Sequence, residues 1–103
     1  MTPIGYALAR EGFLCEDIGM KATEDLASCK AAMSTIQKII PGIATWDDKY
    51  KGSFDDQPKG CSVADNKIYF NTGTTDSFSV GSRQVCSGKQ PYKFHLYSGI
   101  RYF

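Results

Sequence analysis

Residues Thr23 to Gly42 carry the clearest structural pattern of the sequence and read TEDLASCKAAMSTIQKIIPG. Its apolar side chains recur at spacings of three and four, which is the period of one helix face. They are Leu26, Cys29, Met33, Ile36 and Ile40. Thr23 can serve as the N-cap, Glu24 and Asp25 suit the positive end of the helix dipole, and Pro41 ends the pattern. The stretch therefore predicts an amphipathic helix over about residues 24 to 39.

The residues after this helix favour strands. Cys61–Val63 and Lys67–Thr72 are β-prone runs joined by the turn-like trio Ala64-Asp65-Asn66, which predicts a hairpin. Lys67–Asn71 is expected to be the central strand, and Phe78–Cys86 can return as another strand. The predicted fold class is α+β, with one amphipathic helix packed on a small antiparallel sheet.

Four dispersed cysteines favour two disulfides. They are Cys15, Cys29, Cys61 and Cys86, and no Cys-x-x-Cys pair occurs that would indicate a zinc site or a redox dithiol. Four cysteines permit three pairings, which the sequence leaves open; of these we favour Cys15 with Cys86 and Cys29 with Cys61. Two disulfides place the protein in an oxidising compartment, either extracellular or an organelle lumen such as the thylakoid lumen. The alternative is four reduced, buried cysteines in a cytosolic protein.

The segment between the helix and the hairpin, residues 43 to 60, is predicted to be a long, partly ordered loop. It carries Trp46, Asp47, Asp48 and Tyr50, an arrangement that suits stacking and hydrogen bonding to a carbohydrate or another surface ligand. Its Asp pairs lack the spacing of a calcium-binding EF-hand loop, so we expect surface charge and no metal site.

The C-terminal segment is unusually aromatic. The candidate partner-binding residues in this segment are Tyr92, Phe94, Tyr97, Ile100, Tyr102 and Phe103. We divide the chain into an N-terminal extension (1–12), a disulfide-stapled module (13–88) and an aromatic tail (89–103). Two interpretations of the two ends stay open: they complete the sheet of the domain, or they dock onto a partner.

Composition narrows the classes of function. A chain of 103 residues with 42% hydrophobic residues is long enough for one domain. Its formal net charge of +1 lacks the basic surface that nucleic-acid binding requires, so we expect no nucleic-acid partner. No apolar run reaches the roughly 20 residues that span a bilayer, so we expect no membrane span.

Signals of catalysis are missing from the sequence. His95 is the one histidine, and no nucleophile motif or phosphate-binding loop occurs around the serines and glycines. We therefore expect a protein that is not an enzyme and needs no cofactor.

Several short runs resemble a known module. The runs are Cys15-Glu16-Asp17-Ile18-Gly19, Cys29-Lys30-Ala31-Ala32, Pro58-Lys59-Gly60-Cys61, Lys67-Ile68-Tyr69-Phe70-Asn71-Thr72 and Arg83-Gln84-Val85-Cys86. In this order they are similar to an uncharacterised four-cysteine module of secreted or surface proteins in algae, dinoflagellates and marine animals. The resemblance covers roughly residues 13 to 88 and implies an oxidised, non-catalytic module. The single copy and the aromatic tail depart from that family, whose members often repeat the module.

Two functions follow as expectations. The first is a structural accessory or protein-binding subunit that docks onto a larger assembly through its tail, for example on the luminal side of a photosynthetic membrane. The second is a secreted module that recognises carbohydrate or another surface ligand through Trp46, Asp47, Asp48 and Tyr50.

Overall fold

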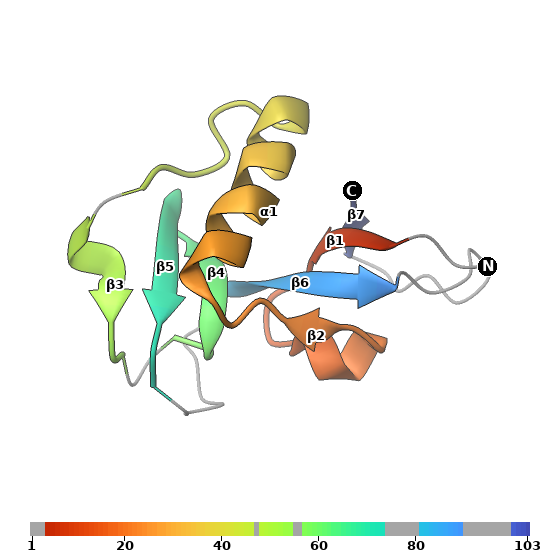
Figure 1. Cartoon of the computed structure of the whole chain (residues 1–103), viewed down its shortest axis with the longest axis horizontal. Helices are drawn as coiled ribbons and strands as arrows, with labels where there is room; N and C mark the ends of the chain where they lie inside the picture. Colours follow the sequence, from red (N-terminus) through yellow and green to blue (C-terminus); the bar gives the residue numbers. More distant parts are fainter. Residues whose placement is uncertain (1–3, 47, 55–56, 74–80, 90–99) are drawn as a thin grey trace.

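A computed structural model gives the fold, and it describes residues 4–46, 48–54, 57–73, 81–89 and 100–103. The elements in chain order are β1 (Ile4–Leu8), the 3₁₀ turn η1 (Cys15–Ile18), β2 (Lys21–Ala22), α1 (Leu26–Ile39), the 3₁₀ turn η2 (Asp48–Tyr50), β3 (Lys51–Gly52), β4 (Gly60–Ala64), β5 (Lys67–Asn71), β6 (Arg83–Lys89) and β7 (Arg101–Tyr102). Figure 1 shows helix α1 lying against the strands, so the predicted α+β class is confirmed.

The strands form one mixed sheet in the order β3–β5–β4–β6–β1–β7, and β2 also pairs with β6. All pairs are antiparallel except β3 with β5. The predicted small antiparallel sheet is thus present, with one short parallel pair at its edge that makes the sheet mixed. β3 and β4 flank β5 and run in opposite directions, so only β4 is antiparallel to β5. The central strand is β6, with neighbours on both edges; the expectation that Lys67–Asn71 is central was wrong, since β5 lies second from the edge.

The predicted hairpin is confirmed as β4 and β5. Asp65 and Asn66 form its two-residue turn with φ of +52° and +62°. Positive φ at both central positions is the backbone of a type I′ turn, which Asn and Asp tolerate better than most residues.

Helix α1 begins two residues later than predicted. Asp25, not Thr23, is the N-cap, and its carboxylate accepts a hydrogen bond from the Ser28 N–H at 2.9 Å. This bond lowers the pKa of Asp25. Thr23 is unsuited to capping because its backbone extends the sheet: its N–H donates to Val85 O and its carbonyl accepts from Cys61 N.

Two apolar cores lie on opposite faces of the sheet. Neighbouring residues of a strand point to opposite faces, and Leu8 and Val85 belong to one core while Ala7 and Cys86 belong to the other. The first core packs α1 on the sheet, with Met33 among its fully buried side chains. The second core covers the other face with the segment that contains η1, and its members are Ala7, Ala9, Cys15, Ile18, Met20 and Cys86.

Each core contains one disulfide. Cys29–Cys61 ties α1 to β4 in the first core, and Cys15–Cys86 ties η1 to β6 in the second. The favoured pairing is thus confirmed. The two disulfides indicate an oxidising, non-cytoplasmic environment.

The chain ends contribute strands where the structure describes them. β1 lies within the segment set apart as an N-terminal extension, and it pairs with β6 over its whole length. β7 pairs with β1, and Phe103 N donates to Tyr6 O. Of the predicted strand Phe78–Cys86, residues 81–86 are described, and β6 begins at Arg83. In the part of the chain that the structure describes, no helix has the length and apolar character to cross a membrane.

Candidate functional site

Reactive groups do not gather in the described part of the chain. Across the described ranges, no three His, Cys, Asp or Glu side chains are placed to hold a metal ion. The four cysteines are all in disulfides, and His95 lies outside the described residues. A site must therefore be sought where aromatic or charged side chains share a surface.

Three aromatic rings meet on the sheet face opposite α1. Tyr69 lies between Ile68 and Phe70, which both belong to the first core, so its side chain points to the other face. Its ring centroid is 4.7 Å from that of Tyr50 and 5.5 Å from that of Phe54. All three rings are half-buried, and we call Tyr50, Phe54 and Tyr69 the aromatic corner.

The edge of the sheet positions Tyr50. This residue ends η2 and directly precedes β3, which pairs in parallel with β5 so that Lys51 lies opposite Phe70. The pairing continues with Thr72 N donating to Gly52 O at 2.8 Å. Because these backbone bonds fix β3 beside β5, the Tyr50 ring is brought against Tyr69.

A buried amide positions Phe54. Asn71 is 2% exposed, and its Oδ1 accepts from the N–H groups of Phe54 and Gly73. Its Nδ2 donates to Phe54 O at 2.9 Å and to Gln57 O at 2.8 Å. This one side chain therefore satisfies backbone groups of Phe54, Gln57 and Gly73, which lie outside the strands. The corner is held by hydrogen bonds on two sides.

Positive charge lies beside the corner. Lys49 Nζ is 5.3 Å from the Tyr50 ring centroid, within the range of a cation–π contact. The surface therefore combines half-buried rings with the ammonium group of Lys49.

Two of the ligand residues predicted from the loop, Trp46 and Tyr50, make their described contacts on opposite faces of the sheet. Trp46 packs against the first core, whereas Tyr50 contacts Tyr69 on the opposite face. Asp47 lies outside the described residues, and Asp48 is described in its backbone only. Phe54 and Tyr69 were not predicted as site residues. The alternation of apolar and polar residues in β5 indicates that Tyr69 faces away from the core. The sequence does not indicate that Tyr50 and Phe54 lie beside it, because they are far from Tyr69 in the chain.

The predicted partner-binding tail is described only at its end. Ile100 packs against the second core and Phe103 against the first. Tyr102 belongs to β7, and its side chain is not described. Tyr92, Phe94 and Tyr97 lie outside the described residues. The end of the tail therefore contributes to the packing of the domain.

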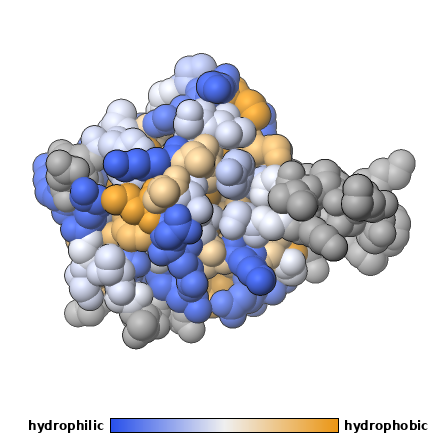
Figure 2. Space-filling view, in the orientation of Figure 1, coloured by the Kyte–Doolittle hydropathy of each residue, from blue (hydrophilic) through white to orange (hydrophobic). Residues whose placement is uncertain are grey.

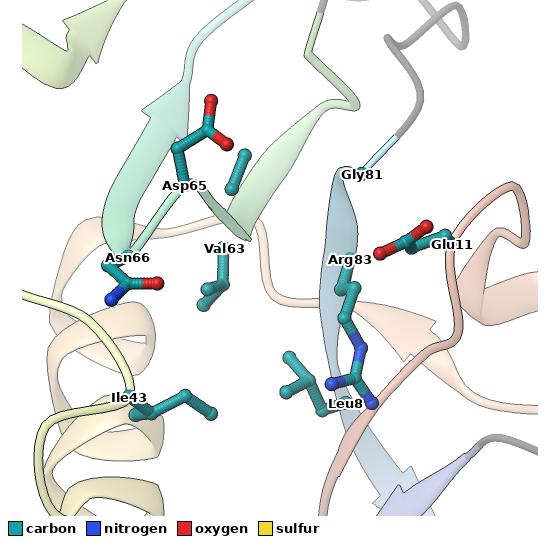
Figure 3. A pocket seen from close by; sticks show the side chains of 9 residues that line it. Leu8, Glu11, Ile43, Val63, Asp65, Asn66, Gly81 and Arg83 are labelled. Atoms are coloured by element: carbon teal, nitrogen blue, oxygen red, sulfur yellow. The ribbon is translucent and has the colours of Figure 1, made fainter.

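A hollow of about 300 Å³ opens at the turn between β4 and β5. Figure 3 shows Arg83 and Leu8 on one wall and Val63, Asp65 and Asn66 on the other. Arg83 Nε donates to Ala9 O at 3.0 Å; burial lowers the pKa of Arg83, and nearby Glu11 opposes that shift. Arg83 thus already donates a hydrogen bond to a backbone carbonyl within the domain. The hollow is therefore a weaker candidate for a ligand site than the aromatic corner.

Comparison of the chain with models of known protein families, with curated proteins and with solved structures yields no match. The similarity to the four-cysteine module stays a prediction.

Proposed function

We propose that the protein is a non-catalytic protein-binding module that acts in an oxidising compartment, and that the aromatic corner is its contact surface. The observation that carries this proposal is the meeting of Tyr50, Phe54 and Tyr69 at one sheet edge. Tyrosine and phenylalanine are enriched at the centres of protein interfaces, where they bury a large area with few rotatable bonds to immobilise.

Rigidity supports the same proposal. The parallel β3–β5 pair and the Asn71 side chain hold the segments that carry the rings. A surface that is ordered before binding loses less conformational entropy when a partner docks. The partner we expect is a larger protein assembly, such as a complex on the luminal side of a photosynthetic membrane, for which this chain is an accessory subunit.

Other described surfaces offer less for a partner. Among the described residues, the one large hydrophobic side chain that is clearly exposed is Ile39, at 50%. Figure 2 shows one face of the molecule, on which apolar areas are small and separated by polar ones. A docking surface on the described residues is therefore better placed at the half-buried rings.

The test is recovery of the partner from the native source in gentle detergent. We expect the wild-type protein to retain one large complex in stoichiometric amount, and Tyr69→Ser to lose it. Ile39→Ser is the matched control, because it removes an exposed apolar side chain elsewhere and should retain the complex. Equal recovery by wild type and Tyr69→Ser, with both folded, would remove the aromatic corner from the proposal.

Carbohydrate recognition is the second candidate, because phenol rings also stack on sugars. The tilt of 59° between Tyr50 and Tyr69 and of 87° between Phe54 and Tyr69 leaves no flat platform, which favours a protein partner. A glycan array distinguishes the two candidates: sugar binding that is lost in Tyr50→Ser would support carbohydrate, and a blank array would support protein.

A further inference from the structure

The two phenol rings of the aromatic corner lie at a distance that suits a covalent bond between them. The centroids of Tyr50 and Tyr69 are 4.7 Å apart, near the short end of the range of about 4.5–7 Å for aromatic pairs in proteins. Two six-membered rings joined by a carbon–carbon bond have their centres only slightly closer. Such rings are also twisted relative to each other, and the observed interplanar angle is 59°.

We propose that Tyr50 and Tyr69 are a modification site at which oxidation forms an intramolecular dityrosine. The inference does not depend on the proposed function, because the coupling requires only that the two phenols lie together and meet an oxidant.

The surroundings of the two rings allow the reaction. Both residues are half-buried, so they are partly accessible to solvent and partly packed against their neighbours. The rings come from η2 and β5, which the β3–β5 pairing holds side by side. The two disulfides place the protein where thiol reductants do not dominate. Phenoxyl radicals formed there would meet each other before they meet a thiol.

The oxidant is hydrogen peroxide acting through a haem peroxidase. Each phenol gives up one electron and its hydroxyl proton, which leaves two phenoxyl radicals. A bond then forms between the ring carbons ortho to the two oxygens. Each of these carbons loses its hydrogen as a proton, both oxygens regain a proton, and both rings become aromatic again. The chain loses two hydrogen atoms in total, and one peroxide molecule is reduced to two water molecules.

The new bond would fix the loop against the sheet. It would join η2 to β5 directly, at an edge where β3 contributes only two residues. A covalent link between distant residues reduces the entropy of the unfolded chain, so the oxidised protein should unfold at a higher urea concentration.

The experiment treats the dilute, disulfide-intact protein with hydrogen peroxide and a haem peroxidase, then isolates the monomer. We expect dityrosine fluorescence and the loss of two hydrogen atoms by mass spectrometry. Trypsin cleaves after Lys49, Lys51 and Lys67, so after reduction of the disulfides the link joins the dipeptide Tyr50-Lys51 to the peptide 68–83. Tyr50→Phe and Tyr69→Phe keep both rings but remove one phenol, and each should abolish this product.

Tyr6→Phe is the matched control, since Tyr6 lies on β1 against the first core and should leave the product unchanged. A wild-type monomer that keeps its mass would overturn the proposal. So would a cross-link that joins other tyrosines and forms equally in Tyr50→Phe and Tyr69→Phe. Neither result bears on partner recovery, which is measured on protein that has not been oxidised.

Discussion

Gly60 begins strand β4 where that strand passes the segment that leads into α1. Its φ is +77°, and a Cβ built on it would lie 2.5 Å from the Thr23 carbonyl oxygen. That oxygen accepts the hydrogen bond of Cys61 N at 2.9 Å, so the two backbones cannot separate without breaking it. Only glycine fits both the backbone conformation and the close approach.

Replacement of Gly60 by Ala should therefore destabilise the protein strongly. We expect a loss of about 3 kcal/mol in the free energy of unfolding, measured by urea denaturation. Gly12 is the matched control, because it also has a positive φ, of +84°, but has no atom within 4 Å of its built Cβ. Gly12→Ala should cost about 1 kcal/mol. Equal losses in the two variants would show that the Thr23 contact is unimportant.

Two residues, Thr23 and Asn71, have roles in the fold that differ from what their residue types suggest. Thr23 is an acceptable N-cap by residue type, and acidic residues follow it in the sequence. In the fold, the backbone of Thr23 bonds to β4 and β6, and the helix starts only after Asp25. Asn71 is the converse case. The residue type of Asn71 does not indicate that its side chain hydrogen-bonds to Phe54 and Gln57. Those contacts arise because these two residues lie beside Asn71 at the end of β5.

At the scale of elements, each disulfide secures one layer to the sheet. Cys29–Cys61 secures α1 and spans 32 residues, while Cys15–Cys86 secures η1 and spans 71. Loop-closure entropy depends only weakly on length, so each bond should contribute about 4 kcal/mol. That is a large part of the roughly 5–15 kcal/mol that stabilises a typical domain.

Removal of either bond should lower the urea midpoint by a similar amount, but should expose different elements. In the double variant Cys15→Ala with Cys86→Ala, we expect faster tryptic cleavage after Arg10 and Lys21, which flank η1. In Cys29→Ala with Cys61→Ala, cleavage after Lys30 and Lys38 of α1 should increase instead. The same cleavage pattern in both variants would contradict the assignment of one bond to one layer.

At the scale of the whole molecule, strand β6 joins the two cores. Val85 is fully buried in the first core and Cys86 in the second. β1 repeats this arrangement with Leu8 and Ala7. Loss of either strand would open both faces at once, so we expect the sheet and its two cores to be lost together when the whole protein unfolds.

Unfolding should therefore be a single cooperative transition. Trp46 packs on the first core, so its fluorescence and the helical circular dichroism should follow one urea curve. Hydrogen exchange provides the comparison between faces: the Ala9 amide bonds to Gln84 O beside the second core, and the Ile68 amide bonds to Thr45 O beside the first. Two amides with clearly different opening free energies would mean that the cores unfold separately.

Features that depend on near neighbours could be predicted from the sequence. The apolar period of 24–39 predicts the helix, residues 61–72 predict the hairpin, and the even number of dispersed cysteines predicts two disulfides. The α+β class follows from these local patterns. In each case the residues that decide the structure lie within a few positions of one another, or their chemistry allows few alternatives.

Contacts between distant segments could not be predicted in this way and became known only from the fold. Pairings between residues far apart in the chain give β6 its central position and make β3 parallel to β5. They also place the two cores on opposite faces of the sheet. The aromatic corner has the same origin, since Tyr50, Phe54 and Tyr69 come together only after the loop has folded back along β5. Residue types fix what each ring can do, but only the long-range backbone hydrogen bonds place the rings together.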